Sequence, residues 1–191
     1  MIALLQGRLV RLAAVDPEEM SRMTSTWYRD SELVRLMDAR PGPLRSASAT
    51  KNWVEKHLDG LGDKEHWFAI RSLQDDSLLG DIGLDVIDGA RRDAYVGIAI
   101  YQREFWGRGY GTEAMQLILE YAFTQVNLRR VTLSVFEYNP RAVHSYEKAG
   151  FRHEGRMRQA LLREGKRWDL IYMGILREEW MEKYDHQTND Q

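Results

Sequence analysis

The chain has 191 residues, of which 43% are apolar, and it carries a formal net charge of −2 with an isoelectric point near 6.2. This length suits one ordinary domain with a core of its own. The charge lacks the basic bias of nucleic-acid-binding proteins, and no apolar run approaches the roughly 18 residues that span a bilayer. We therefore expect one cytoplasmic domain without nucleic-acid or membrane partners, and no signal-peptide cleavage pattern contradicts this.

Periodic apolar patterns divide the chain into short strands and helices. The expected strands cover residues 8–15, 66–72, 78–87, 94–101, 130–136, 151–157 and 168–176. The expected helices cover residues 17–27, 31–37, 48–58, 112–126, 140–149 and 177–184. The segment Pro41-Gly42-Pro43 predicts a break, and residues 186–191 are expected to be loose.

Two connections predict how the strands are arranged. Short polar turns join the three strands between residues 66 and 101, which indicates an antiparallel meander. A helix of about four turns then separates the strands at 94–101 and 130–136, as in a βαβ crossover between parallel neighbours. We therefore predict a mixed α/β fold with helices on both faces of the sheet and the order β-α-α-β-β-β-α-β-α-β-β.

Three glycines at alternate positions, Gly107, Gly109 and Gly111, lie between a strand and a helix. Such a turn lets backbone N–H groups crowd around an anion, and the helix N-terminus adds unsatisfied donors. A Walker loop would need a Lys-Ser or Lys-Thr pair, and a dinucleotide fingerprint would need a glycine where Thr112 stands. The turn is therefore predicted to bind phosphate as an x-x-G-x-G loop.

This loop resembles the pyrophosphate loop of the GNAT acetyltransferase superfamily, which holds acetyl-CoA. The segment Phe105-Trp-Gly-Arg-Gly-Tyr-Gly-Thr-Glu-Ala114 is similar to the branch with ribosomal-protein N-terminal and spermidine acetyltransferases. Trp106 departs from the superfamily pattern, where Gln or Arg is usual, but that branch tolerates the change. Segments 139–151, Asn-Pro-Arg-Ala-Val-His-Ser-Tyr-Glu-Lys-Ala-Gly-Phe, and 168–180 also match, in the same order. The resemblance implies one GNAT domain over residues 8–180 and a short tail at 181–191.

The resemblance also implies acetyl-CoA as co-substrate and a primary amine, on a small molecule or a peptide, as acceptor. The amine would attack the thioester directly in a ternary complex, which agrees with the absence of cysteine. The residues that it places at the cofactor are Ile98, Ala99, Ile100, Arg103, Trp106, Gly107, Arg108, Gly109, Tyr110, Gly111, Thr112, Asn139 and Tyr146.

For several of these residues a purely structural role is the alternative to a role at the cofactor. Arg103 and Arg108 could be solvated, Asn139 is a good helix N-cap, and Tyr146 could be a core aromatic. In the family the matching tyrosine protonates the leaving thiolate. That role suits a phenol of pKa about 10 beside a thiol of about 8.5.

The general base stays open. Asp81, Asp85 and Glu137 are carboxylate candidates, and a water relay ending on Tyr95 or Glu137 is an alternative; each carboxylate could instead be structural. Many relatives have a glutamate near Tyr95. At pH 7 deprotonation costs roughly 4.6 kcal/mol for a lysine-like amine and roughly 1.4 kcal/mol for an α-amine, so a base matters more for the former.

The acceptor and two competing functions also stay open. A protein N-terminus, a polyamine, and an amino-sugar or drug amine are all allowed. A polyamine site would need clustered acids, which Asp85, Asp88 and Glu137 do not obviously form. The competing functions are a catalytically silent module that senses acyl-CoA and a nucleotide-binding protein that uses the same loop.

The remaining residues add few constraints. The histidines lack metal-binding spacing and cysteine is absent, so we predict no metal site. Trp27, Tyr28 and Met37 could line an acceptor pocket or belong to the core. Glu113 is interpreted as an ordinary acid in a first helical turn. The sequence leaves a homodimer open.

Overall fold

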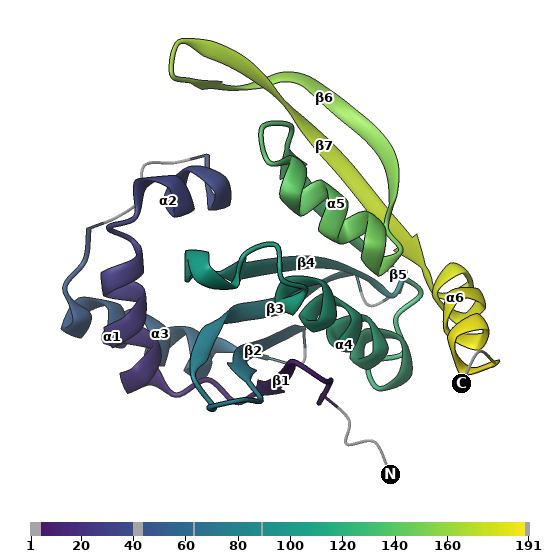
Figure 1. Cartoon of the computed structure of the whole chain (residues 1–191), viewed down its shortest axis with the longest axis horizontal. Helices are drawn as coiled ribbons and strands as arrows, with labels where there is room; N and C mark the ends of the chain where they lie inside the picture. Colours follow the sequence, from purple (N-terminus) through teal and green to yellow (C-terminus); the bar gives the residue numbers. More distant parts are fainter. Residues whose placement is uncertain (1–4, 40–43, 63, 89, 190–191) are drawn as a thin grey trace.

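The computed structural model describes residues 5–39, 44–62, 64–88 and 90–189, and these form one mixed sheet with helices on both faces (Figure 1). The strand order is β1-β2-β3-β4-β5-β7-β6. The strands are β1 (Val10–Ala13), β2 (Glu65–Ser72), β3 (Leu78–Asp88), β4 (Asp93–Ile100), β5 (Arg130–Phe136), β6 (Arg152–Arg163) and β7 (Lys166–Leu176). The helices are α1 (Pro17–Trp27), α2 (Ser31–Met37), α3 (Ala47–Gly60), α4 (Tyr110–Thr124), α5 (Pro140–Ala149) and α6 (Arg177–Asn189), with a 3-10 turn η1 (Arg103–Phe105).

The predicted mixed α/β fold is confirmed, with differences at several elements. Three helices lie between β1 and β2, as the expected ranges 17–27, 31–37 and 48–58 indicate, whereas the predicted order counted only two. Asp30 caps the short helix α2 by accepting the backbone N–H groups of Glu32 and Leu33. Helix α6 continues to Asn189, so it runs across residue 180, where the domain was expected to end and the tail to begin. The predicted break at residues 41–43 and the last two residues lie outside the described part. None of the described helices has the length and apolar content needed to cross a membrane.

Alternating side chains give the two faces of the sheet different surroundings. Even-numbered residues of β3 and β4, such as Ile82 and Val96, pack against α4 in a core that includes the fully buried Phe123. Odd-numbered residues face α1, α2 and α3, where Ala99 belongs to a smaller cluster around Met20. The smaller cluster leaves part of this second face open to a cavity.

The parallel strands β4 and β5 separate soon after they meet. Among the described residues they pair only over 93–95 with 130–132. Strand β4 then runs on to Ile100 along β3, while β5 runs on to Phe136 along β7. An open edge of β4 therefore faces the gap between the two halves of the sheet.

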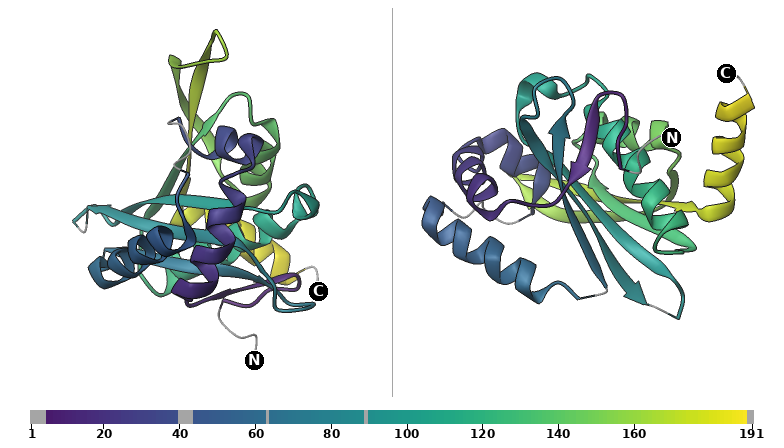
Figure 2. Two further views of the ribbon diagram at one scale, coloured as in Figure 1. Left: turned by 90° about the vertical axis from the view of Figure 1, so that its left-hand side faces the viewer. Right: turned by 90° about the horizontal axis from the view of Figure 1, so that it is seen from below.

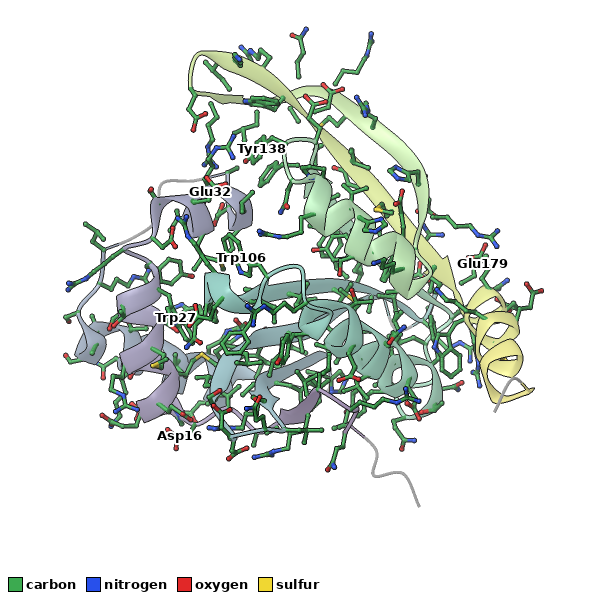
Figure 3. The ribbon with its side chains drawn as sticks, in the orientation of Figure 1. Asp16, Trp27, Glu32, Trp106, Tyr138 and Glu179 are labelled. Atoms are coloured by element: carbon green, nitrogen blue, oxygen red, sulfur yellow. The ribbon has the colours of Figure 1, made fainter. Side chains whose placement is uncertain are left out.

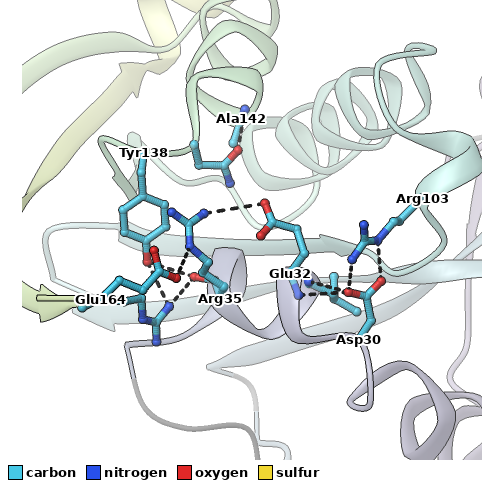
Figure 4. A network of polar contacts seen from close by, with 10 residues as sticks. Asp30, Glu32, Arg35, Arg103, Tyr138, Ala142 and Glu164 are labelled. Carbon is cyan, nitrogen blue, oxygen red and sulfur yellow. Dashed lines mark hydrogen bonds and ion pairs between the residues drawn. The ribbon is translucent and has the colours of Figure 1, made fainter. Parts of the chain in front are cut away.

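The hairpin of β6 and β7 is longer than predicted and stands out from the rest of the molecule (Figure 2). Near the tip of the hairpin, Arg163 contacts the rest of the molecule. Its guanidinium donates to the backbone carbonyls of Arg35, Asp38 and Ala39 at 2.6, 2.9 and 3.1 Å. Arg163 also contacts the Tyr138 hydroxyl at 3.1 Å (Figure 4). The hairpin tip thus holds the C-terminal end of α2.

Glu113 has a larger structural role than a first-turn acid. Its carboxylate accepts the backbone N–H groups of Arg8, Leu9 and Val10 at 2.8, 2.7 and 2.8 Å, and so fixes the start of β1 on α4. The close approach requires Gly7, because an added Cβ there would lie 2.4 Å from the Glu113 Cδ. These bonds explain why the strand begins at Val10 and not at residue 8.

We predict that Glu113→Gln lowers the free energy of unfolding by about 2 kcal/mol, because one carboxylate oxygen becomes an amide that faces backbone N–H donors. Urea denaturation followed by circular dichroism would measure this. The matched control is Glu120→Gln on the same helix, which we expect to change stability by less than about 0.5 kcal/mol. Equal stability of the two variants would contradict the proposed anchoring role.

Candidate active site

The glycine turn has the geometry of an anion-binding loop. Gly107 and Gly109 have φ of +72° and +94°, which side-chain-bearing residues rarely adopt. Gly109 is the N-cap of α4, and no described side chain caps that end. The first N–H groups of the helix therefore remain available to a phosphate. Gly111 differs, since an added Cβ would make only ordinary contact, 3.5 Å from Ile100 Cγ1.

A cavity of about 770 Å³ extends from this loop along the second face of the sheet. The floor is formed by residues of β2, β3, β4 and β5, and the walls come from α1, α2, α3, α5 and the start of α4. Of the three residues that could line an acceptor pocket or belong to the core, Tyr28 and Met37 line this cavity. Trp27 is instead buried and stacks on Tyr101. The cavity thus joins the phosphate loop to the space beneath α1–α3.

The open edge of β4 meets this cavity. Ile98, Ala99 and Ile100 all line it, as the cofactor prediction requires. The Ile100 carbonyl is already bonded by the indole N–H of Trp106 at 2.6 Å. Trp106 lies centrally beneath α2 (Figure 3), and its ring lies 3.7 Å from the Arg141 guanidinium carbon. Trp106 therefore shapes the cavity through its side chain, which adds to the backbone role expected of the loop.

Neither predicted arginine is among the described residues that line the cavity. Arg103 instead binds the Asp30 carboxylate through Nε at 2.6 Å and through a second guanidinium nitrogen (Figure 4). This hydrogen bond is the main reason that the pKa of Asp30 falls to about 2. Arg108 is exposed. The arginine and the lysine that do line the cavity, Arg141 and Lys148, come from α5 and were missed, because nothing in their local sequence distinguishes them from solvated residues.

Helix α5 brings two predicted residues to the cavity. Asn139 caps it, with its side-chain oxygen accepting the Ala142 N–H at 3.2 Å, and its amide nitrogen remains as a donor. Tyr146 lines the cavity, and burial, with a smaller contribution from Tyr95, raises its pKa to about 12. Thr112 is bonded to Ser145 at 2.8 Å, which ties the phosphate loop to α5. Tyr110 packs edge-on against Phe105 and supports the loop from behind.

Two candidates for proton transfer have different surroundings. Tyr95 lines the cavity and donates to the Ser134 hydroxyl, and burial raises its pKa. Glu137 is not among the described lining residues. Its carboxylate accepts the Asp169 backbone N–H at 3.0 Å and lies 3.3 Å from Arg156, so it fastens the base of the hairpin. Glu137 thus lies outside the described lining of the cavity, and its role in proton transfer stays a prediction.

The cavity floor carries acids that the sequence did not reveal as a group. Glu65, Asp81 and Asp85 all line it, with Glu65 and Asp85 directly opposite in the β2–β3 register. Asp81 accepts from the Trp67 indole at 2.7 Å and from the Tyr101 hydroxyl, and burial raises its pKa. Glu65 was missed because it lies 20 residues from Asp85 in the chain.

Residues 9–152 match the family model described as an acetyltransferase (GNAT) domain. The chain belongs to the GNAT acetyltransferase family. It is 29% identical to the uncharacterized N-acetyltransferase YokL of Bacillus subtilis, over 91% of this chain and 93% of that protein. It is 30% identical to the spermidine N(1)-acetyltransferase of Vibrio cholerae over 74% and 79% of the two chains. A crystal structure of spermidine N-acetyltransferase from Vibrio cholerae with CoA and spermine superposes with a TM-score of 0.77 at 26% identity, over 90% of this chain and 98% of that one.

A GNAT protein is an acetyl-CoA-dependent enzyme, and the residues present fit that cofactor. The left-handed glycines and uncapped helix start suit a pyrophosphate, and the open β4 edge suits an extended amide-bearing arm. The described residues contain no group of three or more His, Asp or Glu side chains placed to bind a metal ion.

The loop geometry predicts unequal effects of two alanine substitutions. Gly109→Ala puts a Cβ on a residue at φ +94°, so the turn must distort and acetyl-CoA affinity should fall by at least about tenfold. Gly111→Ala, two residues away, has ordinary backbone and ordinary contacts and should change affinity far less. Isothermal calorimetry with acetyl-CoA would compare them; equal losses would contradict this difference.

Proposed function

We propose that this acetyltransferase transfers the acetyl group of acetyl-CoA directly to a primary amine of a small polycationic acceptor, with polyamines as the first candidates. The observation that carries the proposal is the cluster of Glu65, Asp81 and Asp85 on the cavity floor. Asp81 and Asp85 are four residues apart on one face of β3, about 13 Å, a span that a polyamine can bridge with two of its nitrogens. The naming of relatives as spermidine acetyltransferases supports the same class.

Aromatic rings make the same wall suitable for an alkyl chain that carries charge. Trp53 stacks on His57 with centroids 5.2 Å apart, and Trp67 lies edge-on to both. All three rings line the cavity. Such faces attract ammonium groups and cover methylene groups, which favours an extended amine over a sugar with many hydroxyls.

In the proposed reaction the amine attacks the thioester carbon, and the tetrahedral intermediate then loses the thiolate. Backbone donors on the open edge of β4 stabilise the developing oxyanion. Tyr146 gives its proton to the departing sulfur. With a pKa of about 12, Tyr146 stays protonated throughout the working pH range, although it is a weaker acid than an ordinary phenol.

We predict that Tyr146→Phe lowers kcat by about 10²- to 10⁴-fold and leaves the Kd of acetyl-CoA within about threefold. Phenylalanine keeps the ring packing, including the edge contact with Phe151, and removes only the proton donor. Steady-state kinetics and calorimetry on the same preparations would separate the two quantities. Unchanged turnover would remove Tyr146 from the mechanism.

An acceptor screen tests the proposed class. Thiol release from acetyl-CoA would be followed with polyamines, N-terminal peptides and amino sugars, and we expect the highest kcat/KM for a polyamine. Asp85→Asn should raise the KM of a polyamine by about threefold or more and that of a monoamine less. Glu55→Gln, on the exposed side of α3, is the matched control. A preference for peptides or sugars would overturn the polyamine assignment but not the acetyltransferase.

A further inference from the structure

Two glycines lie side by side in the middle of the cavity floor, and the Trp67 side chain borders them, 3.5 Å from the position of an added Cβ at Gly83. Gly83 of β3 and Gly97 of β4 lie directly opposite each other, and both line the cavity. A Cβ added to Gly97 would have no described heavy atom within 4 Å, so packing within the fold does not require glycine there. Glycine in a strand interior weakens the sheet and often marks where a ligand approaches the backbone.

The neighbours of this glycine pair on the same face are chemically distinct. On one side the next cross-strand pair is Asp81 with Ala99, and on the other it is Asp85 with Tyr95. Same-face rows along a strand are about 6.6 Å apart, so the glycine pair forms a gap with a carboxylate on each side. Its size suits an amine and its first methylene groups lying against the backbone.

Asp81 is oriented toward the cavity by two neutral donors, the Trp67 indole and the Tyr101 hydroxyl. No described lysine, arginine or histidine lies within 4 Å of its carboxylate. The titratable groups around it are Tyr101, His57 of α3, which lies 2.7 Å from Glu65, and Tyr28, the C-cap of α1, beyond Tyr101. A half-buried carboxylate with only neutral donors has a negative charge that a bound cation would balance.

We propose that the acceptor nitrogen is seated over the Gly83–Gly97 pair and gives its ammonium proton to Asp81, which makes Asp81 the general base. This inference rests on the proposed function. The R–NH₃⁺ group and the carboxylate become R–NH₂ and a carboxylic acid, and the nitrogen lone pair then forms the C–N bond. The C–S bond breaks and Tyr146 protonates the sulfur; its phenolate takes the second proton from the nitrogen. Asp81 finally releases its proton to water, and the products are the acetylamine, CoA thiol and one proton.

The surroundings of Asp81 suit this role. Burial raises its pKa, which brings the carboxylate closer to the working pH and makes it a stronger base than an exposed aspartate. The hydrogen bond from Tyr101 opposes this shift and fixes the direction of the lone pairs. Tyr101 keeps its own proton, since burial and the adjacent carboxylate raise its pKa well above the usual value. Tyr101 is therefore a positioning residue for Asp81.

The seat is tested by Gly97→Ala. The new methyl group fits the fold and projects into the gap, so we expect the acceptor KM to rise at least about tenfold while the Kd of acetyl-CoA and the melting temperature do not fall. A thermal melt and calorimetry on the same variant separate a blocked seat from a damaged fold. An unchanged acceptor KM would overturn the seat.

The base is tested by Asp81→Asn, which keeps an oxygen acceptor for Trp67 and an amide that can donate to the Tyr101 oxygen. We expect kcat/KM to fall at least about 10²-fold and the acidic limb of its pH profile to disappear. The loss should shrink for a fluorinated analogue of the acceptor whose amine has a lower pKa, since less help with deprotonation is needed. Asp85→Asn is the control: it removes the same charge from the same face of β3, and its pH profile of kcat/KM should keep the acidic limb.

Two further outcomes make the test decisive. Tyr101→Phe removes a hydrogen bond that lowers the pKa of Asp81, so the acidic limb should move to higher pH. The base assignment would be overturned if Asp81→Asn lowered kcat/KM equally for the acceptor and its fluorinated analogue. It would also be overturned if the acidic limb of the pH profile remained in that variant. If the wild-type chain acetylates no amine, the proposed function itself fails; if it turns over and these variants behave like wild type, only this inference fails.

Discussion

The brief pairing of β4 with β5 is the constraint on which the rest of the site depends. Each strand is fully paired on its other side, β4 with β3 and β5 with β7, so the two halves of the sheet stay ordered while they diverge. Helix α4 connects β4 to β5, and its glycine-rich start lies at the open end of β4. One divergence thus places an anion site, an open strand edge and a cavity next to each other. An extended cofactor with a phosphate end and an amide arm matches that arrangement.

Across this gap the molecule is held together by two arginines, of which Arg103 had been predicted at the cofactor. Arg103 binds the residue that caps α2, and Arg163 from the hairpin tip binds the carbonyls at the other end of the same helix. Helix α2 is only seven residues long, too short to be stable from its own hydrogen bonds. Its position over the cavity therefore depends on contacts from β4's end and from the hairpin, which belong to opposite halves of the sheet.

Local signals predicted the strands, the helices and the phosphate loop, because periodicity, caps and left-handed glycines act over a few residues. They did not reveal contacts between residues far apart in sequence: Glu113 accepts N–H groups more than 100 positions away, and Glu137 accepts the backbone N–H of Asp169 in the hairpin. The hairpin itself was predicted too short. A register shift between Met157 and Leu161 breaks the alternation, and the outer strand has no buried face to show a pattern. The grouping of acids on the cavity floor was not predicted for the same reason, since only the β2–β3 register brings Glu65 next to Asp85.

On the face of the sheet that borders the cavity, the features that the sequence did not predict are also features that destabilise a sheet. Two strand glycines each cost the fold about 0.5–1 kcal/mol, and a half-buried carboxylate without a cation adds a desolvation penalty. On the opposite face Ile82, Leu84 and Val96 pack against α4 in a continuous apolar core. The fold itself requires the β3 glycine on that face, Gly80, because an added Cβ would lie 1.8 Å from the Ala99 carbonyl oxygen. Since both faces belong to the same strands, the difference does not come from strand propensity. It reflects what covers each face: a helix on one side, and on the other a cavity in which a ligand would supply the missing contacts and charge.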